Sequence, residues 1–213
     1  MDEIFTIHGI HTSKDRKTWQ DEFKKYVDKN STQFACHTFK YGFWVGVVPY
    51  FSTWLNKVGR SHFSRQYFNF IMKHHKKGNP INLVGHSFGT WIIHDVIEIF
   101  RKKNIPIKSI HLLAGVISSH IERNRLDEYL DGKHVQKIYV WSSKEDEICR
   151  SAPYPFGHVG YWGIIDKIND EDTREARYKP YTHYNIYNHI THLEHSGYSS
   201  PKVFGQILFD ILF

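Results

Sequence analysis

The sequence predicts an α/β fold in one domain over residues 1–213: a doubly wound, mostly parallel six-stranded sheet with helices on both faces. Three observations support this prediction. Short apolar, β-prone runs alternate with helical patterns, an order that requires a parallel sheet covered by helices. The 213 residues suffice for one domain with a substantial core, and no linker rich in proline or serine divides them. One strand-to-helix junction also carries the pattern G-x-S-x-G.

The first half of the chain alternates strand and helix patterns. Its helical stretches carry apolar residues three or four positions apart, as at Trp19 and Phe23, and its strand stretches are short β-prone runs. Gly78 and Pro80 end the second helical pattern. The expected elements are a strand over 4–8, a helix over 18–27, a strand over 34–41, a helix over 56–77, a strand from 81 to the glycine junction and a helix over 91–103.

The second half continues the alternation with longer connections. The expected elements are a strand over 107–115, a helix around 122–130, strands over 136–143 and 184–190, and a closing helix over 201–213. The fifth strand is followed by a long stretch rich in glycine, proline and aromatic residues, and then by a charged segment over 166–177. We expect a loop over the first of these stretches, as far as Gly163, and assign no element to the charged segment.

The junction from Gly85 to Gly89 carries the functional prediction. A strand that reverses sharply into a helix forces Ser87 into a strained backbone conformation, and bulky side chains two residues to either side would collide with the turn. Such a turn exposes the serine hydroxyl above the sheet, with the N-terminus of a helix behind it. An ordinary strand-to-helix turn that contains serine by chance is the alternative interpretation.

In this strand–turn–helix context the sequence resembles the α/β-hydrolase family, and more narrowly its small lipase- and esterase-like members. The resemblance covers nearly the whole chain in the order of its elements, but the usual first two antiparallel strands are missing, which implies a minimal α/β-hydrolase fold. It implies a serine hydrolase that cleaves an acyl ester of a small molecule or lipid without a metal ion or cofactor. The same chemistry handles thioesters and amides, and a non-catalytic binding protein with an unreactive Ser87 is the alternative.

The turn after the first predicted strand resembles the oxyanion motif of that family. Backbone N–H groups held in a water-poor pocket stabilise the negative charge that develops on the substrate oxygen. The resemblance implies that the amides of Ile10 and Phe88 are the donors and that Gly9 lets the chain approach the substrate, with His8 and His86 beside them. A simple strand-ending turn at residues 8–9 is the alternative.

A serine nucleophile needs a base within hydrogen-bond reach, and the base needs a carboxylate that holds its tautomer. Asp146 follows the fifth predicted strand and begins a D-x-[IV] turn that resembles the family's acid turn, so it is the expected acid. Glu145 and a merely solvated acidic loop are the alternatives. His195 lies in the loop before the closing helix, where the family places its base, and His192 is the alternative.

The chain contains 16 histidines, so a histidine near any motif is common by chance. His189, His192 and His195 are spaced by three, which would place them on one face of a helix as metal ligands. Their neighbours favour strand and loop, and no cysteine or ordered set of acids completes a site. We therefore predict no metal.

Composition limits the classes of partner. Lys plus Arg exceeds Asp plus Glu by six and the pI is about 9.1, but the basic residues are scattered. Their one cluster, at 73–77, indicates a solvated helix end rather than a nucleic-acid surface, and leaves weak peripheral attraction to anionic membranes open. We see no secretory signal and no apolar stretch near the roughly 20 residues of a membrane span. Cys36 and Cys149 are expected to be free thiols in a reducing, cytoplasmic compartment, and one disulfide between them is the alternative.

Residues 41–55 are the most apolar and aromatic part of the chain. Two glycines and Pro49 disfavour a regular helix across the first half of this segment. A buried connection into the next helix is one interpretation. The others are a wall of the acyl pocket and a mobile lid that touches lipid.

Overall fold

The three-dimensional structure is a computed structural model of the chain. It describes residues 1–9, 18–40, 53–117, 128–151, 158–163, 165–169, 176–180 and 185–213. Several sequence predictions therefore fall outside the described residues, wholly or in part. Among them are the oxyanion donor Ile10, the proposed lid over 41–55 as far as residue 52, and the helix around 122–130, of which only residues 128–130 are described and are helical.

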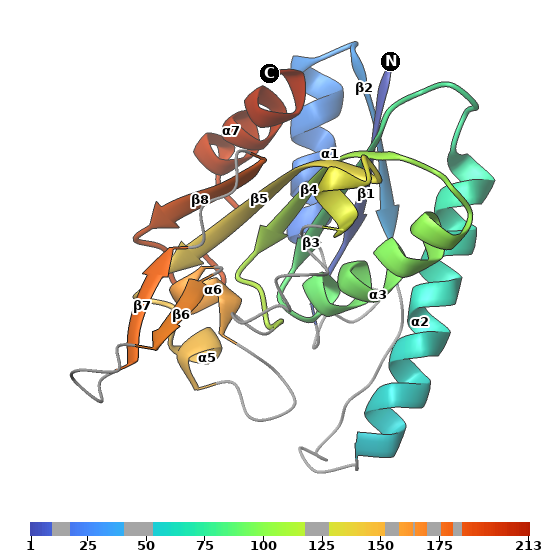
Figure 1. Cartoon of the computed structure of the whole chain (residues 1–213). Helices are drawn as coiled ribbons and strands as arrows, with labels where there is room; N and C mark the ends of the chain where they lie inside the picture. The colour runs from blue at the N-terminus through green and yellow to red at the C-terminus, as the bar shows by residue number, and fades with distance from the viewer. Residues whose placement is uncertain are drawn as a thin grey trace.

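The main sheet has six strands, all parallel, in the spatial order β2-β1-β3-β4-β5-β8 (Figure 1). The strands are β1 Asp2–Ile7, β2 Phe34–Phe39, β3 Ile81–His86, β4 Ile107–Leu113, β5 Val135–Ser143 and β8 Ile186–Thr191. This confirms the predicted parallel sheet. Strand β2 is added on one side of β1, whereas β3 and all later strands of the sheet are added on the other side. The strand order therefore reverses between β1 and β3. Ligands of open α/β sheets bind beyond the carboxyl ends of the strands at such a reversal.

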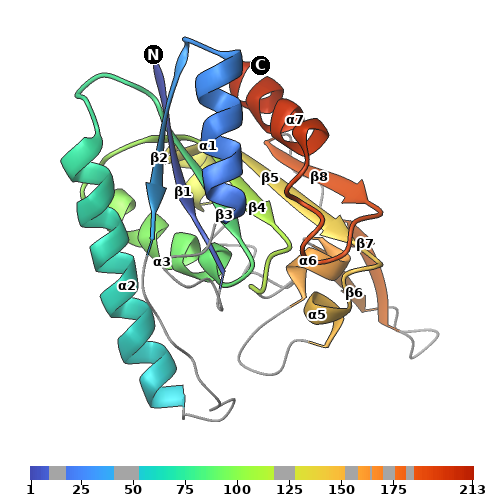
Figure 2. The same ribbon diagram turned by 180° about the vertical axis from the view of Figure 1, so that it is seen from behind.

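Long helices cover both faces of the sheet (Figures 1 and 2). They are α1 Trp19–Asn30, α2 Thr53–His74, α3 Phe88–Lys102 and α7 Pro201–Leu212. Helices α1 and α7 pack together, with the Phe23 and Phe204 ring centroids 5.2 Å apart. Helices α2 and α3 pack together through Phe68 and Phe100, whose centroids are 5.1 Å apart. Aromatic side chains thus join neighbouring helices within each layer.

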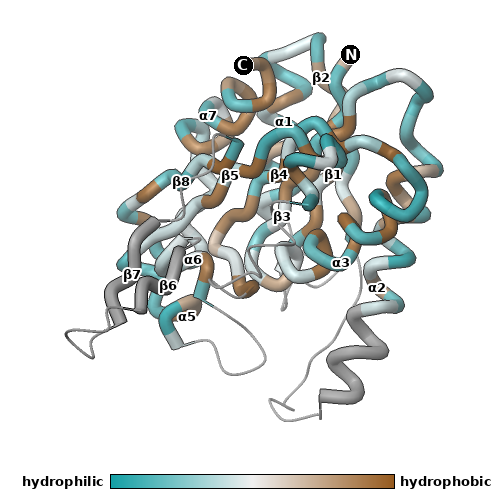
Figure 3. Tube along the Cα trace, viewed as in Figure 1, coloured by the Kyte–Doolittle hydropathy of each residue, from teal (hydrophilic) through white to brown (hydrophobic). Residues whose placement is uncertain are grey.

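The core lies between the sheet and these helices. Most side chains of β1, β3 and β4 are buried, as expected for parallel strands covered on both faces. Figure 3 shows hydrophobic residues along the central strands and hydrophilic residues over much of the outer surface of the helices. Among the described residues, no helix combines the length and apolar character that crossing a membrane requires.

Between residues 143 and 184 the structure has elements that the sequence patterns do not predict. Strands β6 Ile165–Asn169 and β7 Ala176–Pro180 form a separate antiparallel pair, and the one-turn helices α5 Glu147–Arg150 and α6 Val159–Trp162 precede them. The strand pair overlaps the charged segment over 166–177, which lacks the apolar alternation of a half-buried strand. Helices of four residues are too short to produce a recognisable helical period.

Candidate active site

Ser87 is the single residue that separates β3 from α3. Its φ of 54° and ψ of −125° lie outside the regions that non-glycine residues favour. Conformations of this kind cost on the order of 1–3 kcal/mol and persist where the surroundings impose them. Here the Ser87 N–H donates to the carbonyl of Leu113 at the end of β4, 2.9 Å away, and Thr90 in the first turn of α3 donates its hydroxyl to the Ser87 carbonyl at 2.6 Å.

Two glycines allow the end of β1 to approach this turn. A Cβ at Gly9 would lie 2.8 Å from the Cβ of Ser87 and 3.1 Å from its Oγ. A Cβ at Gly89 would lie 2.6 Å from the carbonyl oxygen of Ile7 and 2.8 Å from that of His8. Real Cβ atoms essentially never lie within 3.0 Å of a heavy atom beyond the adjacent residues, so glycine is required where β1, the serine turn and the start of α3 meet.

His195 joins Ser87 to Asp146. Its Nε2 lies 2.9 Å from the Oγ of Ser87, and its Nδ1 lies 2.9 Å from Oδ2 of Asp146 and 3.1 Å from Oδ1. An ionised carboxylate only accepts hydrogen bonds, so Nδ1 carries the imidazole proton and donates it to Asp146. Nε2 then presents its lone pair to the hydroxyl of Ser87. The structure therefore brings the three predicted residues into one continuous hydrogen-bonded chain.

Asp146 is fully buried at the start of α5. Burial by itself would raise the pKa of its carboxyl group. The hydrogen bond from His195 and the one from the backbone N–H of Cys149, 2.8 Å from Oδ1, more than offset burial, and the pKa of Asp146 is lowered. Asp146 consequently stays ionised at neutral pH and can hold the tautomer of His195 described above.

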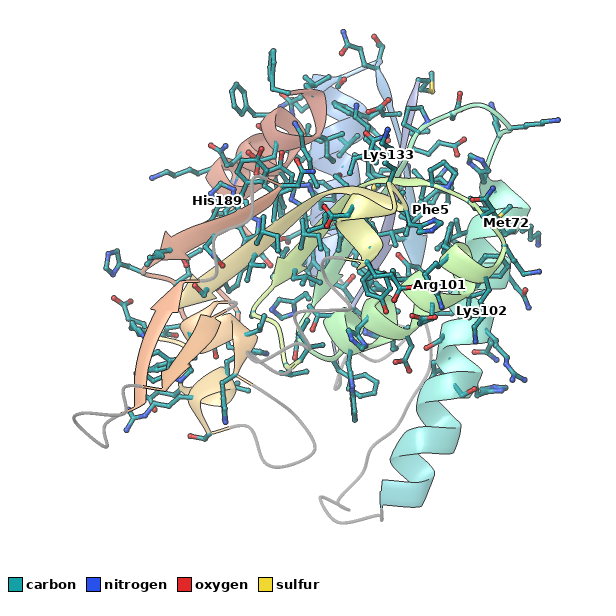
Figure 4. All side chains as sticks on the ribbon, in the orientation of Figure 1. Phe5, Met72, Arg101, Lys102, Lys133 and His189 are labelled. Carbon is teal, nitrogen blue, oxygen red and sulfur yellow. The ribbon has the colours of Figure 1, made fainter. Side chains whose placement is uncertain are left out.

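The alternative acid and the alternative base contact each other. His192 Nδ1 lies 3.2 Å from Oε1 of Glu145, and the His192 side chain is 88% exposed. His189, on the edge strand β8 (Figure 4), lies 3.0 Å from Oδ2 of Asp210 on α7. The three histidines spaced by three residues thus face three different carboxylates rather than a common point.

The residues of the predicted oxyanion site lie close to Ser87, as far as they are described. Phe88 is the first residue of α3, and the N–H groups of a first helical turn point out of the helix toward its N-terminal end. Gly9 approaches Ser87 as given above, and Nδ1 of His8 lies 2.5 Å from the carbonyl oxygen of Gly9. His86 makes a different contact: its Nε2 lies 2.8 Å from the carbonyl oxygen of His195.

Cys149 is a member of the site that sequence reasoning missed. Its thiol lies 3.7 Å from Nδ1 of His195 and donates to the carbonyl of Ala114 at 3.3 Å. Within the described part of the chain, Asp146, Cys149 and His195 have potential metal-ligating atoms within 4.8 Å of one another. Burial, with the charge of Asp146 adding to it, raises the pKa of the thiol, and a thiol that keeps its proton is a poor metal ligand. The only available signal was position, three residues after the predicted acid.

The sequence matches no protein-family model and no curated protein. Its structure is similar to solved structures of low sequence identity. An uncharacterized protein from Bacillus cereus ATCC 10987 is 18% identical with a TM-score of 0.55, over 99% of this chain and 58% of that chain. Phospholipase PlaB from Legionella pneumophila, in complex with thio-NAD, is 14% identical with a TM-score of 0.54. The match covers 96% of this chain and 54% of that chain.

A third structure is similar over almost its whole length. RedJ with a PEG molecule bound in its active site is 10% identical with a TM-score of 0.52, over 98% of this chain and 91% of that chain. RedJ is a thioesterase from the prodiginine biosynthetic pathway in Streptomyces coelicolor. The chain spans less than two thirds of the Bacillus cereus protein and of PlaB. At these identities the likeness concerns the fold.

Proposed function

For a chain with an α/β-hydrolase-like fold, we propose that the activity is that of a serine hydrolase acting on acyl esters. One observation carries the proposal: Ser87, His195 and Asp146 form a continuous chain of hydrogen bonds, with 2.9 Å on each side of the imidazole. Nucleophile, base and orienting acid are the three parts that activation of a serine hydroxyl needs. The strained turn at Ser87 supports the proposal, since it holds the side chain at the carboxyl end of the sheet.

The proposed reaction has two halves. The Oγ of Ser87 attacks the ester carbonyl while Nε2 of His195 takes the hydroxyl proton, and Asp146 stabilises the imidazolium that forms. The tetrahedral intermediate collapses when His195 returns the proton to the leaving alcohol, which leaves an acyl group on Ser87. Water, deprotonated by His195, then attacks the acyl-enzyme and releases the acid. The N–H of Phe88 and that of Ile10 are the proposed donors to the oxyanion.

The proposed substrate is a small-molecule or lipid acyl ester, and no metal ion or cofactor takes part. Thioester and amide bonds are open to the same nucleophile, and the structurally similar proteins include a phospholipase and a thioesterase. Acyl-chain-length profiling with esters and thioesters of a common acid separates these substrate classes.

The test is the variant Ser87→Ala assayed with a short p-nitrophenyl ester. Loss of the nucleophile is expected to lower kcat by roughly 10⁴-fold or more, because the base and the acid do not act without it. A fluorophosphonate probe provides an independent readout, since it forms a covalent bond to an activated serine oxygen with loss of fluoride. We expect wild-type protein to be labelled at Ser87 and the variant to remain unlabelled.

Two outcomes contradict the proposal. Full esterase activity in folded Ser87→Ala would show that another group carries the reaction. A folded wild-type protein that neither hydrolyses esters nor reacts with the probe would favour the alternative, a binding protein with an unreactive serine.

A further inference from the structure

The backbone of His195 lies outside regular secondary structure. Residues 192–194 connect β8 to a turn over 195–198, and α7 begins at Pro201. Asp146 holds one nitrogen of the imidazole, but it does not hold the Cα atom from which the ring projects. A misplacement of about 1 Å in a reacting group can lower a rate by two orders of magnitude. A base in such a loop therefore needs a further contact to its backbone.

His86 provides that contact. Its Nε2 lies 2.8 Å from the carbonyl oxygen of His195. A carbonyl oxygen only accepts hydrogen bonds, so Nε2 of His86 must carry a proton and donate it. The two imidazole centroids are 5.0 Å apart. Tyr198 and Trp19 enclose the ring of His86 further, each at a centroid distance of 6.0 Å.

We propose that His86 is a positioning residue that anchors the backbone of His195, so that residues 86 and 87 hold the base at two points. His86 binds the carbonyl group of His195 while Ser87 contacts its imidazole. Because these two residues are adjacent in the chain, the distance between Oγ of Ser87 and Nε2 of His195 depends on the short, strained turn at Ser87. The inference rests on the proposed function, for which it assigns a role to the residue before the nucleophile.

The ionisation of His86 is consistent with an anchor rather than a second base. Burial, and then the nearby His195, lower the pKa of His86 to about 4. His86 consequently stays neutral at pH 7, and its protonated Nε2 is the atom that donates to the carbonyl. No positive charge from His86 opposes the charge that His195 acquires when it takes the serine proton.

The test compares three substitutions of His86: two that place a hydrogen-bond donor at different distances from the backbone, and one that removes the donor. The amide nitrogen of glutamine reaches about as far as Nε2 of histidine, whereas that of asparagine reaches only the position of Nδ1. His86→Gln is expected to keep kcat within a few-fold of wild type. His86→Asn and His86→Leu are expected to lower kcat by roughly 10- to 100-fold with KM little changed, because the base is misplaced while substrate contacts remain.

Rates are expressed per folded molecule, with the folded fraction taken from near-UV circular dichroism. If His86→Leu does not fold, the comparison of the two amides decides, since both are polar and uncharged. Equal kcat in His86→Gln and His86→Asn, or wild-type kcat in His86→Leu, would overturn the inference. Ser87→Ala distinguishes failure of the proposed hydrolase function from failure of the anchoring role. If Ser87→Ala is inactive while all His86 variants remain fully active, only the anchoring role of His86 fails.

Discussion

At the scale of single residues, two histidines three positions apart have opposite surroundings. His195 contacts the fully buried Asp146 and the hydroxyl of Ser87, and its own side chain is largely buried. His192 projects into solvent and contacts Glu145, which is also exposed. Contacts between exposed polar side chains contribute little free energy because water competes for them. His192 and Glu145 are therefore matched controls for His195 and Asp146.

We expect His195→Ala to lower kcat for a p-nitrophenyl ester by roughly 10³-fold or more, and His192→Ala to leave kcat unchanged. The reason is that only His195 can take the proton of Ser87. Asp146→Asn and Glu145→Gln are expected to differ in the same way, since only Asp146 orients the base. A larger loss in His192→Ala than in His195→Ala would reject the assignment of the base.

At the scale of secondary-structure elements, Glu3 on β1 binds the connection between α2 and β3 at the amino end of the sheet. Its buried carboxylate lies 2.6 Å from Nδ1 of His75, just after α2, and accepts from the backbone N–H of Lys76 at 3.0 Å and from Nδ2 of Asn79 at 3.0 Å. Burial would raise the pKa of Glu3, but the hydrogen bonds from Asn79, His75 and Lys76 outweigh it and lower the pKa.

We expect Glu3→Gln to lower the free energy of unfolding at pH 7 by about 1–3 kcal/mol, because buried donors lose a charged acceptor. A carboxyl group whose pKa is lowered by folding stabilises the protein above its unfolded pKa, near 4.5, and that stabilisation is lost as pH falls through the folded pKa. The difference between wild type and variant should therefore shrink below pH 4.5. Urea unfolding at pH 7 and at pH 4 measures it.

The exposed Glu147 offers a control for that measurement. It pairs with Arg150 at the surface, so Glu147→Gln should change stability little at either pH. A loss in Glu147→Gln as large as that in Glu3→Gln would show that the effect reflects overall charge and not the junction of β1 with α2.

At the scale of the whole molecule, His111 in the middle of the sheet couples stability to pH. It is fully buried on β4, stacks on Tyr139 of β5 at a centroid distance of 4.6 Å, and its two ring nitrogens have no hydrogen-bond partner among the described residues. Burial lowers the pKa of His111 to about 3. The folded protein therefore disfavours protonation of this ring, and the unfolded chain takes up the proton more readily.

We expect wild-type stability to fall as pH drops from about 6.5 toward 3. The unfolded chain binds a proton at His111 near pH 6.5 and the folded chain only near pH 3, so this group contributes up to about 1.4 kcal/mol per pH unit in that window. His111→Phe keeps a flat ring on Tyr139 and removes the titrating group, so its stability should fall less between pH 7 and pH 5.

Urea unfolding at both pH values tests this prediction, with His192→Phe as the control because that side chain is exposed. An equal decrease in His111→Phe and wild type would contradict it. His86 also has a lowered pKa, so part of the acid sensitivity is expected to remain in His111→Phe.

The serine turn and the choice of acid and base differ in how far the sequence could predict them. The turn is a local feature: an apolar strand, two glycines and an amphipathic helix lie next to each other in the chain, and the structure has β3, Ser87 and α3 at those positions. For Asp146 and His195, in contrast, only the resemblance to the α/β-hydrolase family distinguishes them in the sequence from neighbouring acids and histidines. Which imidazole turns toward Ser87 depends on where β8 ends and α7 begins. The hydrophobic periodicity of the sequence does not indicate this.

The sequence by itself determined the order of the six strands of the main sheet and of the four long helices, and that the sheet is parallel, because hydrophobic periodicity and glycine placement act within a few residues. Only the tertiary structure decided which histidine meets which carboxylate, that the residue before Ser87 binds the backbone of His195, and that the thiol of Cys149 lies 3.7 Å from Nδ1 of His195. These contacts join segments about 50 to 110 positions apart, and their geometry follows from how whole strands and helices pack.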